Sequence, residues 1–166
     1  MATRGVVYIH SAPPALCPHV EWAVGGALDV RVQVDWTPQP ASPGALRGEL
    51  SWQAEPGTAA RIASALRGWL HLRFEVTEEP SPGCEGERYS CTPTLGIHRA
   101  AIGVHGDLLV PENRIRAAIT AAEDPTALST LVEELDKVLG TAWDAELEPF
   151  RYAGDGAPVR WLHQVV

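Results

Sequence analysis

Three segments in which apolar and polar residues alternate constrain the fold of this chain more than any other feature. They are residues 30–36, 46–52 and 70–77. A period of two is typical of strands that have one buried and one exposed face. An apolar run at residues 6–9 precedes them, and stretches with helical spacing lie at residues 17–28 and 57–69. The order therefore predicts strand, helix, strand, strand, helix, strand.

This predicted order, βαββαβ, is that of ferredoxin-like folds, in which both helices cover one face of an antiparallel sheet. Further strands are predicted at residues 88–91, 95–104, 108–110 and 159–166. Residues 111–122 favour a helix, and the apolar spacing from 125 to 148 predicts a second one that packs along the core and is closed by Pro149. We therefore predict an α+β fold with a ferredoxin-like βαββαβ core, extended by additional strands and two C-terminal helices.

The length and composition of the chain bound its organisation. With 166 residues, of which 45% are apolar, the chain is long enough for one sizeable core, so we predict a single α+β domain over residues 1–166. No apolar run approaches the roughly 18 residues that a membrane span needs, and no signal-peptide pattern precedes the first strand. We expect a cytoplasmic protein that does not enter membranes. The odd number of cysteines, three, favours reduced thiols.

The negative charge of the chain is concentrated in one segment. The net charge is −8, and residues 123–148 hold eight acidic residues against a single lysine. This segment would repel a polyanion, and no basic stripe elsewhere would attract one. We therefore expect no binding to nucleic acid. The acidic side of the predicted helix serves either solvation or the docking of a basic partner.

The outward face of the predicted sheet also argues against RNA recognition. RNA-binding sheets of this topology stack bases on exposed aromatic residues. The outward positions here are charged or polar: Arg31, Gln33, Asp35, Arg47, Glu49, Ser51, Arg73 and Glu75. Such a face fits a protein or self-association surface, or simple solvation.

The residues best suited to chemistry lie where the first strand ends and the first helix begins. A thiolate at a helix N-terminus has a lowered pKa, and a nearby imidazole can act as its base. The candidate catalytic residues are Cys17, His19 and His10, and the candidate ligand-binding residues are Ser11 and Glu21. Helical residues two positions apart point in different directions, so the alternative is a buried cysteine beside a capping or surface histidine.

The remaining patterns predict no metal and no cofactor. Cys84 and Cys91 are separated by six residues, outside the spacing of zinc-binding pairs. The glycine-rich motifs of nucleotide-binding loops and the nucleophile elbow of hydrolases do not occur.

Four stretches of the chain resemble an actinobacterial protein family of unknown function and similar length: residues 4–13, 17–22, 72–78 and 143–150. The resemblance spans nearly the whole chain. It brings no assigned activity, so it transfers no functional residue. Because members of that family are sometimes encoded near fatty-acid synthesis genes, it implies an accessory role in that process.

Two hypotheses about function follow. The first is a non-enzymatic accessory or regulatory protein that acts through contacts with a partner protein or with a second copy, linked to fatty-acid and lipid metabolism. The lack of a convincing catalytic set and the concentrated acidic charge favour it. The second is a small-molecule-binding protein or enzyme that uses a Cys/His pocket after the first strand.

Overall fold

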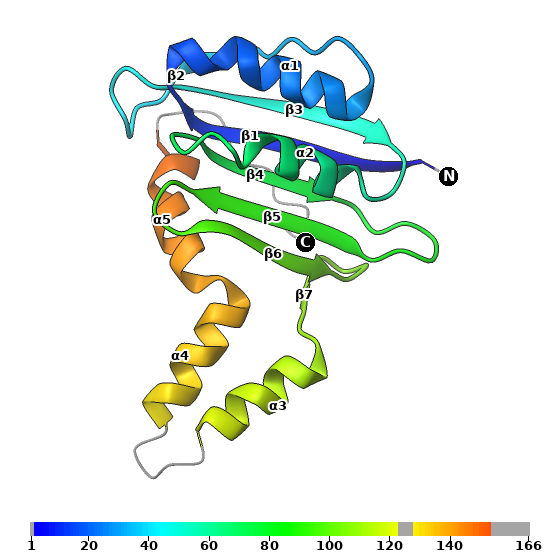
Figure 1. Ribbon diagram of the computed structural model, residues 1–166, viewed down its shortest axis with the longest axis vertical. Helices are drawn as coiled ribbons and strands as arrows, with labels where there is room; N and C mark the ends of the chain where they lie inside the picture. Colours follow the sequence, from blue (N-terminus) through cyan, green and yellow to red (C-terminus); the bar gives the residue numbers. More distant parts are fainter. Residues whose placement is uncertain (1, 123–127, 154–166) are drawn as a thin grey trace.

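The computed structural model describes residues 2–122 and 128–153, in which a sheet of seven strands carries five α-helices (Figure 1). The N-terminal part contains β1 (Thr3–Ala12), a 3₁₀ turn η1 (Pro14–Leu16), α1 (Cys17–Leu28), β2 (Thr37–Pro38), β3 (Leu46–Ala54), α2 (Thr58–Leu66) and β4 (Arg73–Glu78). The C-terminal part contains β5 (Gly86–Thr92), β6 (Gly96–Ile102), β7 (Leu108–Leu109), α3 (Glu112–Ala121), α4 (Leu128–Leu139) and α5 (Thr141–Arg151). In the described part of the chain, no helix is both long and apolar enough to cross a membrane.

The strands are ordered β2-β3-β1-β4-β5-β6-β7, and all neighbours are antiparallel. The fold is therefore α+β, as predicted. Figure 1 shows α1 and α2 together on one face of the sheet. Val7 and Ile9 of β1 are buried in the core beneath these helices, together with Val20 of α1, Ile62 of α2 and Phe74 of β4. Because side chains alternate along a strand, the residues of β1 between and beyond Val7 and Ile9 point to the opposite face.

Gly5 marks a close approach between β1 and its neighbours. A Cβ atom at this position would overlap the ring of Trp52 on β3 and the carbonyl oxygen of Thr77 on β4. We expect Gly5→Ala to lower the free energy of unfolding by about 1–3 kcal/mol, because a packed core absorbs an added methyl group poorly. A Cβ atom at Gly26 inside α1 would meet no atom within 4 Å, so Gly26→Ala is the matched control.

The control substitution should raise the free energy of unfolding by up to about 1 kcal/mol, because alanine favours the helical backbone over glycine. Urea unfolding of both variants measures these changes. Equal effects of the two substitutions would contradict the close approach at Gly5.

The predicted strand at residues 30–36 is wrong. Residues 31–36 belong to no strand, and pairing with β3 begins only at Thr37. The carboxylate of Glu21 on α1 accepts hydrogen bonds from the Val34 backbone N–H at 2.9 Å and from the Trp36 indole N–H at 3.0 Å. These bonds tie the segment to α1. The alternation in this segment therefore reflects the burial of Val34 and the packing of Val32 and Trp36 against the core. It does not reflect hydrogen-bonded pairing with a neighbouring strand.

The predicted helix from 125 to 148 is two helices, so three helices follow β7 where two were predicted. The break lies at Gly140, whose φ of 76° is in the left-handed region that glycine adopts without strain. The backbone N–H of Gly140 donates a hydrogen bond to the carbonyl oxygen of Asp136 at 2.9 Å, and this bond closes α4. Pro149 lies inside α5 and does not end it.

The prediction that this helix packs along the core holds for only one of its two halves. In the described part of the chain, α4 has no buried residue, whereas Leu147 of α5 is fully buried. α5 contacts β1 and β5 on the sheet face opposite α1 and α2. The predicted strands near residues 88, 95 and 108 are confirmed as β5, β6 and β7. The last predicted strand, residues 159–166, lies outside the described residues.

The predicted exposure of the second sheet face is wrong where α5 covers it. β4 begins at Arg73, and its remaining five residues are all buried. Glu75, which the alternation places on the outward face, does point away from the main core, but its side chain is fully covered. A charged residue on a covered face requires partners, and these form the candidate site.

Candidate functional site

A buried polar cluster lies on the sheet face that α5 covers, with Glu75 of β4 at its centre. The carboxylate of Glu75 accepts hydrogen bonds from His10 Nε2 at 2.6 Å and from Arg151 of α5, at 3.0 Å from Nε and 2.6 Å from Nη2. Arg88 and Ser90 of β5 donate to the same carboxylate at 3.2 and 3.1 Å. Three strands and one helix therefore meet at a single buried charge.

Asp144 of α5 adds a second carboxylate to this cluster. Its Oδ1 atom accepts hydrogen bonds from Arg88 at 2.6 Å and from Arg151 at 2.8 Å. Burial alone would raise the pKa of Glu75, but the hydrogen bonds and charges of His10 and Arg151 outweigh it and lower this pKa to about 2. The Glu75 carboxylate is therefore ionised at neutral pH and acts only as a hydrogen-bond acceptor.

The backbone of β1 is irregular where it enters this cluster. Ile9 and Ser11 pair with consecutive residues of β4, Phe74 and Arg73, so β1 carries one extra residue at His10. The register of β1 against β3 shifts over the same residues. Such bulges re-aim a side chain and are frequent next to functional sites. The bulge leaves both His10 and Ser11 buried.

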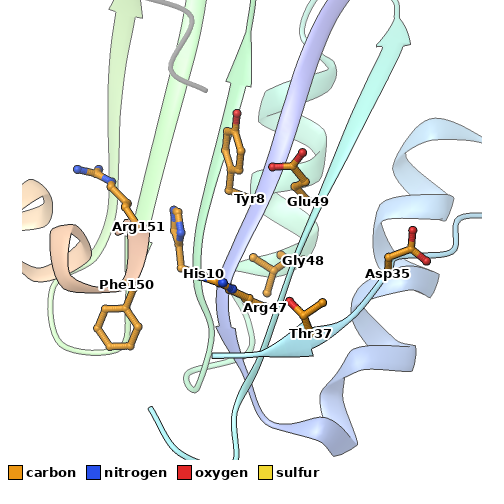
Figure 2. A pocket seen from close by; sticks show the side chains of 10 residues that line it. Tyr8, His10, Asp35, Thr37, Arg47, Gly48, Glu49, Phe150 and Arg151 are labelled. Atoms are coloured by element: carbon orange, nitrogen blue, oxygen red, sulfur yellow. The ribbon is translucent and has the colours of Figure 1, made fainter. Parts of the chain in front are cut away.

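A cavity of about 130 Å³ opens beside His10, between β1, β3 and the end of α5 (Figure 2). Tyr8 and Phe150 give it aromatic walls, and the charged side chains of Arg47 and Glu49 also line it. The rings of Tyr8 and His10 are nearly parallel, with centroids 6.0 Å apart. The cavity therefore combines an aromatic surface with an imidazole and charges of both signs.

Cys17 and His19 lie at the start of α1, on the other side of the sheet from this cavity. The buried Cys17 thiol donates to the Pro13 carbonyl oxygen at 3.7 Å. Burial, and then the negative charge of Glu21, raise the pKa of the thiol, which lowers the fraction of reactive thiolate. His19 is exposed, with its ring centroid 6.3 Å from that of Trp69. The catalytic role of Cys17 with His19 stays a prediction, and the surroundings of the thiol do not favour it.

The other predicted residues divide between the two sides of the sheet. His10 joins the Glu75 cluster and the cavity, and Ser11 follows it in the bulge. Glu21 instead holds the segment after α1, through its bonds to Val34 and Trp36. The predicted ligand-binding roles of Ser11 and Glu21 are untested and stay predictions.

Sequence reasoning missed Glu75, Arg88 and Arg151 as members of a site. The alternation along β4 correctly places Glu75 away from the main core, but it carries no sign that a helix covers that face. The partners of Glu75 are separated from it by up to 76 residues. Only the strand order and the position of α5 bring them together.

Comparison with known proteins identifies the family of this chain. A family model described as "Protein of unknown function (DUF3145)" matches residues 6–164. The chain belongs to this family. The match confirms the predicted membership of a family of unknown function across nearly the whole chain. Comparisons with curated proteins and with solved structures found no match.

This DUF3145 chain also presents a second feature of functional interest, a helical hairpin formed by α3 and α4. The two helices contact each other and extend away from the sheet beyond β7 (Figure 1). In their described residues, Ala118 alone is buried. Large apolar side chains are nonetheless exposed along both helices, and we call them the hairpin surface: Ile115, Ile119, Leu128, Val132 and Leu139.

Proposed function

We propose that this DUF3145 protein is a non-catalytic accessory or regulatory protein of the cytoplasm that acts through protein contacts made by its hairpin surface. The observation that carries the proposal is the exposure of this surface. Leu128 is 76% exposed, and Ile119 and Val132 are more than half exposed. Contiguous exposed apolar residues with polar borders mark interaction sites on soluble proteins.

The spacing of these residues supports docking of a helix. Leu128, Val132 and Leu139 recur on α4 at intervals of four and seven residues, and Ile115 and Ile119 are four apart on α3. Residues at these intervals form a stripe along a helix. A two-helix platform with apolar stripes accepts the apolar face of a third amphipathic helix.

The charges beside the stripe indicate the chemistry of the partner. α4 carries Glu133, Glu134 and Asp136 against Lys137 alone, and Lys137 already pairs with Glu134 at 2.6 Å. The border along α4 is therefore negative, whereas α3 carries Arg114 and Arg116 against Glu112, so the basic flank of a partner would lie along α4. We therefore propose a protein partner that presents an amphipathic helix with lysine or arginine at its edges. The link to fatty-acid and lipid metabolism stays a prediction from the family resemblance.

The experiment places a photoreactive amino acid at position 119 of the full-length chain in native cells. We expect a discrete cross-linked adduct with a basic partner. Adding Val132→Asp to the photoreactive chain should reduce the adduct about tenfold or more, because a charge buried in an apolar contact costs at least the 1.4 kcal/mol that a factor of ten represents.

The matched control adds Val30→Asp instead, which introduces the same charge at a valine that is 58% exposed after α1. This control should leave the adduct unchanged. Loss of the adduct in both variants, or no adduct at all, would contradict the proposal. An adduct formed only between two copies of the chain would contradict the basic partner and show that the hairpin surface mediates self-association.

The ferredoxin-like description of the core is also a proposal. The strand order β2-β3-β1-β4, with α1 and α2 on one face, supports it. β2 departs from the predicted pattern, because it has only two residues and lies at Thr37–Pro38, after the predicted strand at residues 30–36.

A further inference from the structure

A second cavity lies at the end of the sheet where the β4–β5 loop (residues 79–85) and the β6–β7 turn (residues 103–107) meet. Gly86 pairs with Ile102, so the two connections leave the sheet side by side (Figure 1). They border a cavity of about 510 Å³, against about 130 Å³ for the cavity beside His10. Binding sites for small molecules occupy about 300–1,000 Å³, so this cavity is large enough for a ligand.

Backbone hydrogen bonds fix both walls of this cavity. Ser81 and Cys84 each donate an N–H to the carbonyl oxygen of the other, at 3.0 and 2.8 Å. In the β6–β7 turn, the Gly103 N–H donates to the Asp107 carbonyl oxygen at 2.9 Å, and the Gly106 N–H donates to the Gly103 carbonyl oxygen at 2.9 Å. Walls that are already ordered lose little freedom when a ligand binds between them.

The lining of the cavity is mainly apolar and carries two acidic side chains. Ile102 is buried, whereas Val104 and Leu109 are 79% and 39% exposed and offer apolar surface to a ligand. Glu85 and Asp107 also line the cavity, and none of the described lining residues is lysine or arginine. Within the described part of the chain, the side chains of these two acids make no hydrogen bond and no ion pair. Carboxylates without a cationic partner, beside an apolar surface, favour a ligand that carries both a positive charge and an apolar group.

We propose that this cavity binds a small organic ammonium ion, whose apolar group packs against Ile102, Val104 and Leu109 and whose positive charge lies beside Glu85 and Asp107. The site shares no residue with the cavity on the other sheet face or with the hairpin surface. It adds a small-molecule ligand to the proposed accessory protein and does not depend on a partner.

The test compares three probes that have the same apolar cage: 1-adamantylammonium, 1-adamantanol and 1-adamantanecarboxylate. NMR of the full-length protein, labelled at the methyl groups of isoleucine and leucine, follows each titration at pH 8. The ammonium probe should give saturable shifts at Ile102 and Leu109. The alcohol should bind about threefold more weakly and the carboxylate about tenfold more weakly, because two exposed carboxylates contribute only as much as surface ion pairs do.

The thiol of Cys84 provides a second readout of the same cavity. Cys84 lines the cavity and is exposed, whereas Cys17 and Cys91 are buried. The reaction of the Cys84 thiol with iodoacetamide should slow as the ammonium probe is added, with the same midpoint as the NMR shifts. The carboxylate probe at the same concentration should protect the thiol less.

Variants assign the charge preference to the two carboxylates. Glu85→Gln and Asp107→Asn should each weaken binding of the ammonium probe about threefold, and together about tenfold, without changing the binding of the alcohol. His105→Gln, which replaces another polar lining residue, should not weaken binding. The matched control is Glu148→Gln, which removes the same charge from an exposed position of α5, at the opposite end of the sheet (Figure 1).

Three results would each overturn the proposal. They are the absence of a saturable shift with the ammonium probe, equal binding of the three probes, and equal effects of Glu85→Gln and Glu148→Gln on the binding of the ammonium probe.

Discussion

Replacing Glu75 by glutamine should lower the free energy of unfolding by about 3–5 kcal/mol, the usual effect of removing one partner from a buried ion pair. The amide cannot neutralise Arg151, whose guanidinium is 5% exposed and donates two hydrogen bonds to the carboxylate. It also offers one acceptor oxygen where the carboxylate offers two. Urea unfolding, monitored by circular dichroism, measures the change.

The matched control is Glu112→Gln on α3. Glu112 also pairs with an arginine, Arg116, but both side chains are about three-quarters exposed. Exposed pairs at this spacing contribute about 0.3–0.5 kcal/mol, so the control should be nearly neutral. If Glu75→Gln cost no more than Glu112→Gln, the buried network would not hold α5 on the sheet.

Acid should destabilise the protein by about 3 kcal/mol through the same carboxylate. The pKa of Glu75 is about 2 in the folded chain, against an ordinary value of 4.5. A carboxyl group with a lowered folded-state pKa binds fewer protons when folded than when unfolded. Its stabilisation is therefore complete above about pH 4.5, declines as the pH falls, and is lost below about pH 2. Each pKa unit corresponds to about 1.4 kcal/mol, which sets the magnitude.

Carbon NMR of the Glu75 carboxyl group, followed from about pH 6 down to about pH 2, tests this directly. The carboxyl resonance should remain that of the ionised form through pH 4. The free energy of unfolding should fall over the same interval, and the fall should be smaller in Glu75→Gln. A midpoint for Glu75 near 4.5 would contradict the proposed role of His10 and Arg151.

His98 adds a second, separate contribution to the acid response. Burial lowers its pKa from the ordinary value of 6.5, against the effect of its bond to the Val138 carbonyl oxygen. A histidine with a lowered folded-state pKa also destabilises the protein as the pH falls, but from about pH 6.5 downward. The Glu75 effect begins about two pH units lower, so the two are distinguishable.

The Glu75 network connects the interior of the sheet to the hairpin surface. Arg151 and Asp144 seat α5 on β4 and β5, and the indole N–H of Trp143 donates to the Gly96 carbonyl oxygen at 3.0 Å. α5 follows α4 directly at Gly140, beside the His98 ring. The direction in which the hairpin leaves the sheet therefore depends on how α5 is seated. Loss of the network should therefore disturb the proposed partner contact at the hairpin surface as well as stability.

Elements whose pattern is local could be predicted from the amino-acid sequence. An apolar run predicts β1, and periods of two and of about 3.6 predict β3, β4, α1 and α2, because each pattern records which faces of one element are buried. The same reasoning failed for residues 31–36. Alternating burial there arises from contact with α1 through Glu21, and a period of two cannot distinguish such contact from strand pairing.

The candidate site, in contrast, depends on the arrangement of the elements in space. His10 and Glu75 are 65 residues apart, and Glu75 and Arg151 are 76 residues apart, so their contacts require the observed strand order and the placement of α5. The exposure of α4 beside the burial of α5 likewise follows from the turn at Gly140, which directs two similar helices to different surroundings. An amphipathic pattern indicates that a face is suited to burial, but it cannot indicate what covers that face, because the covering element is remote in sequence.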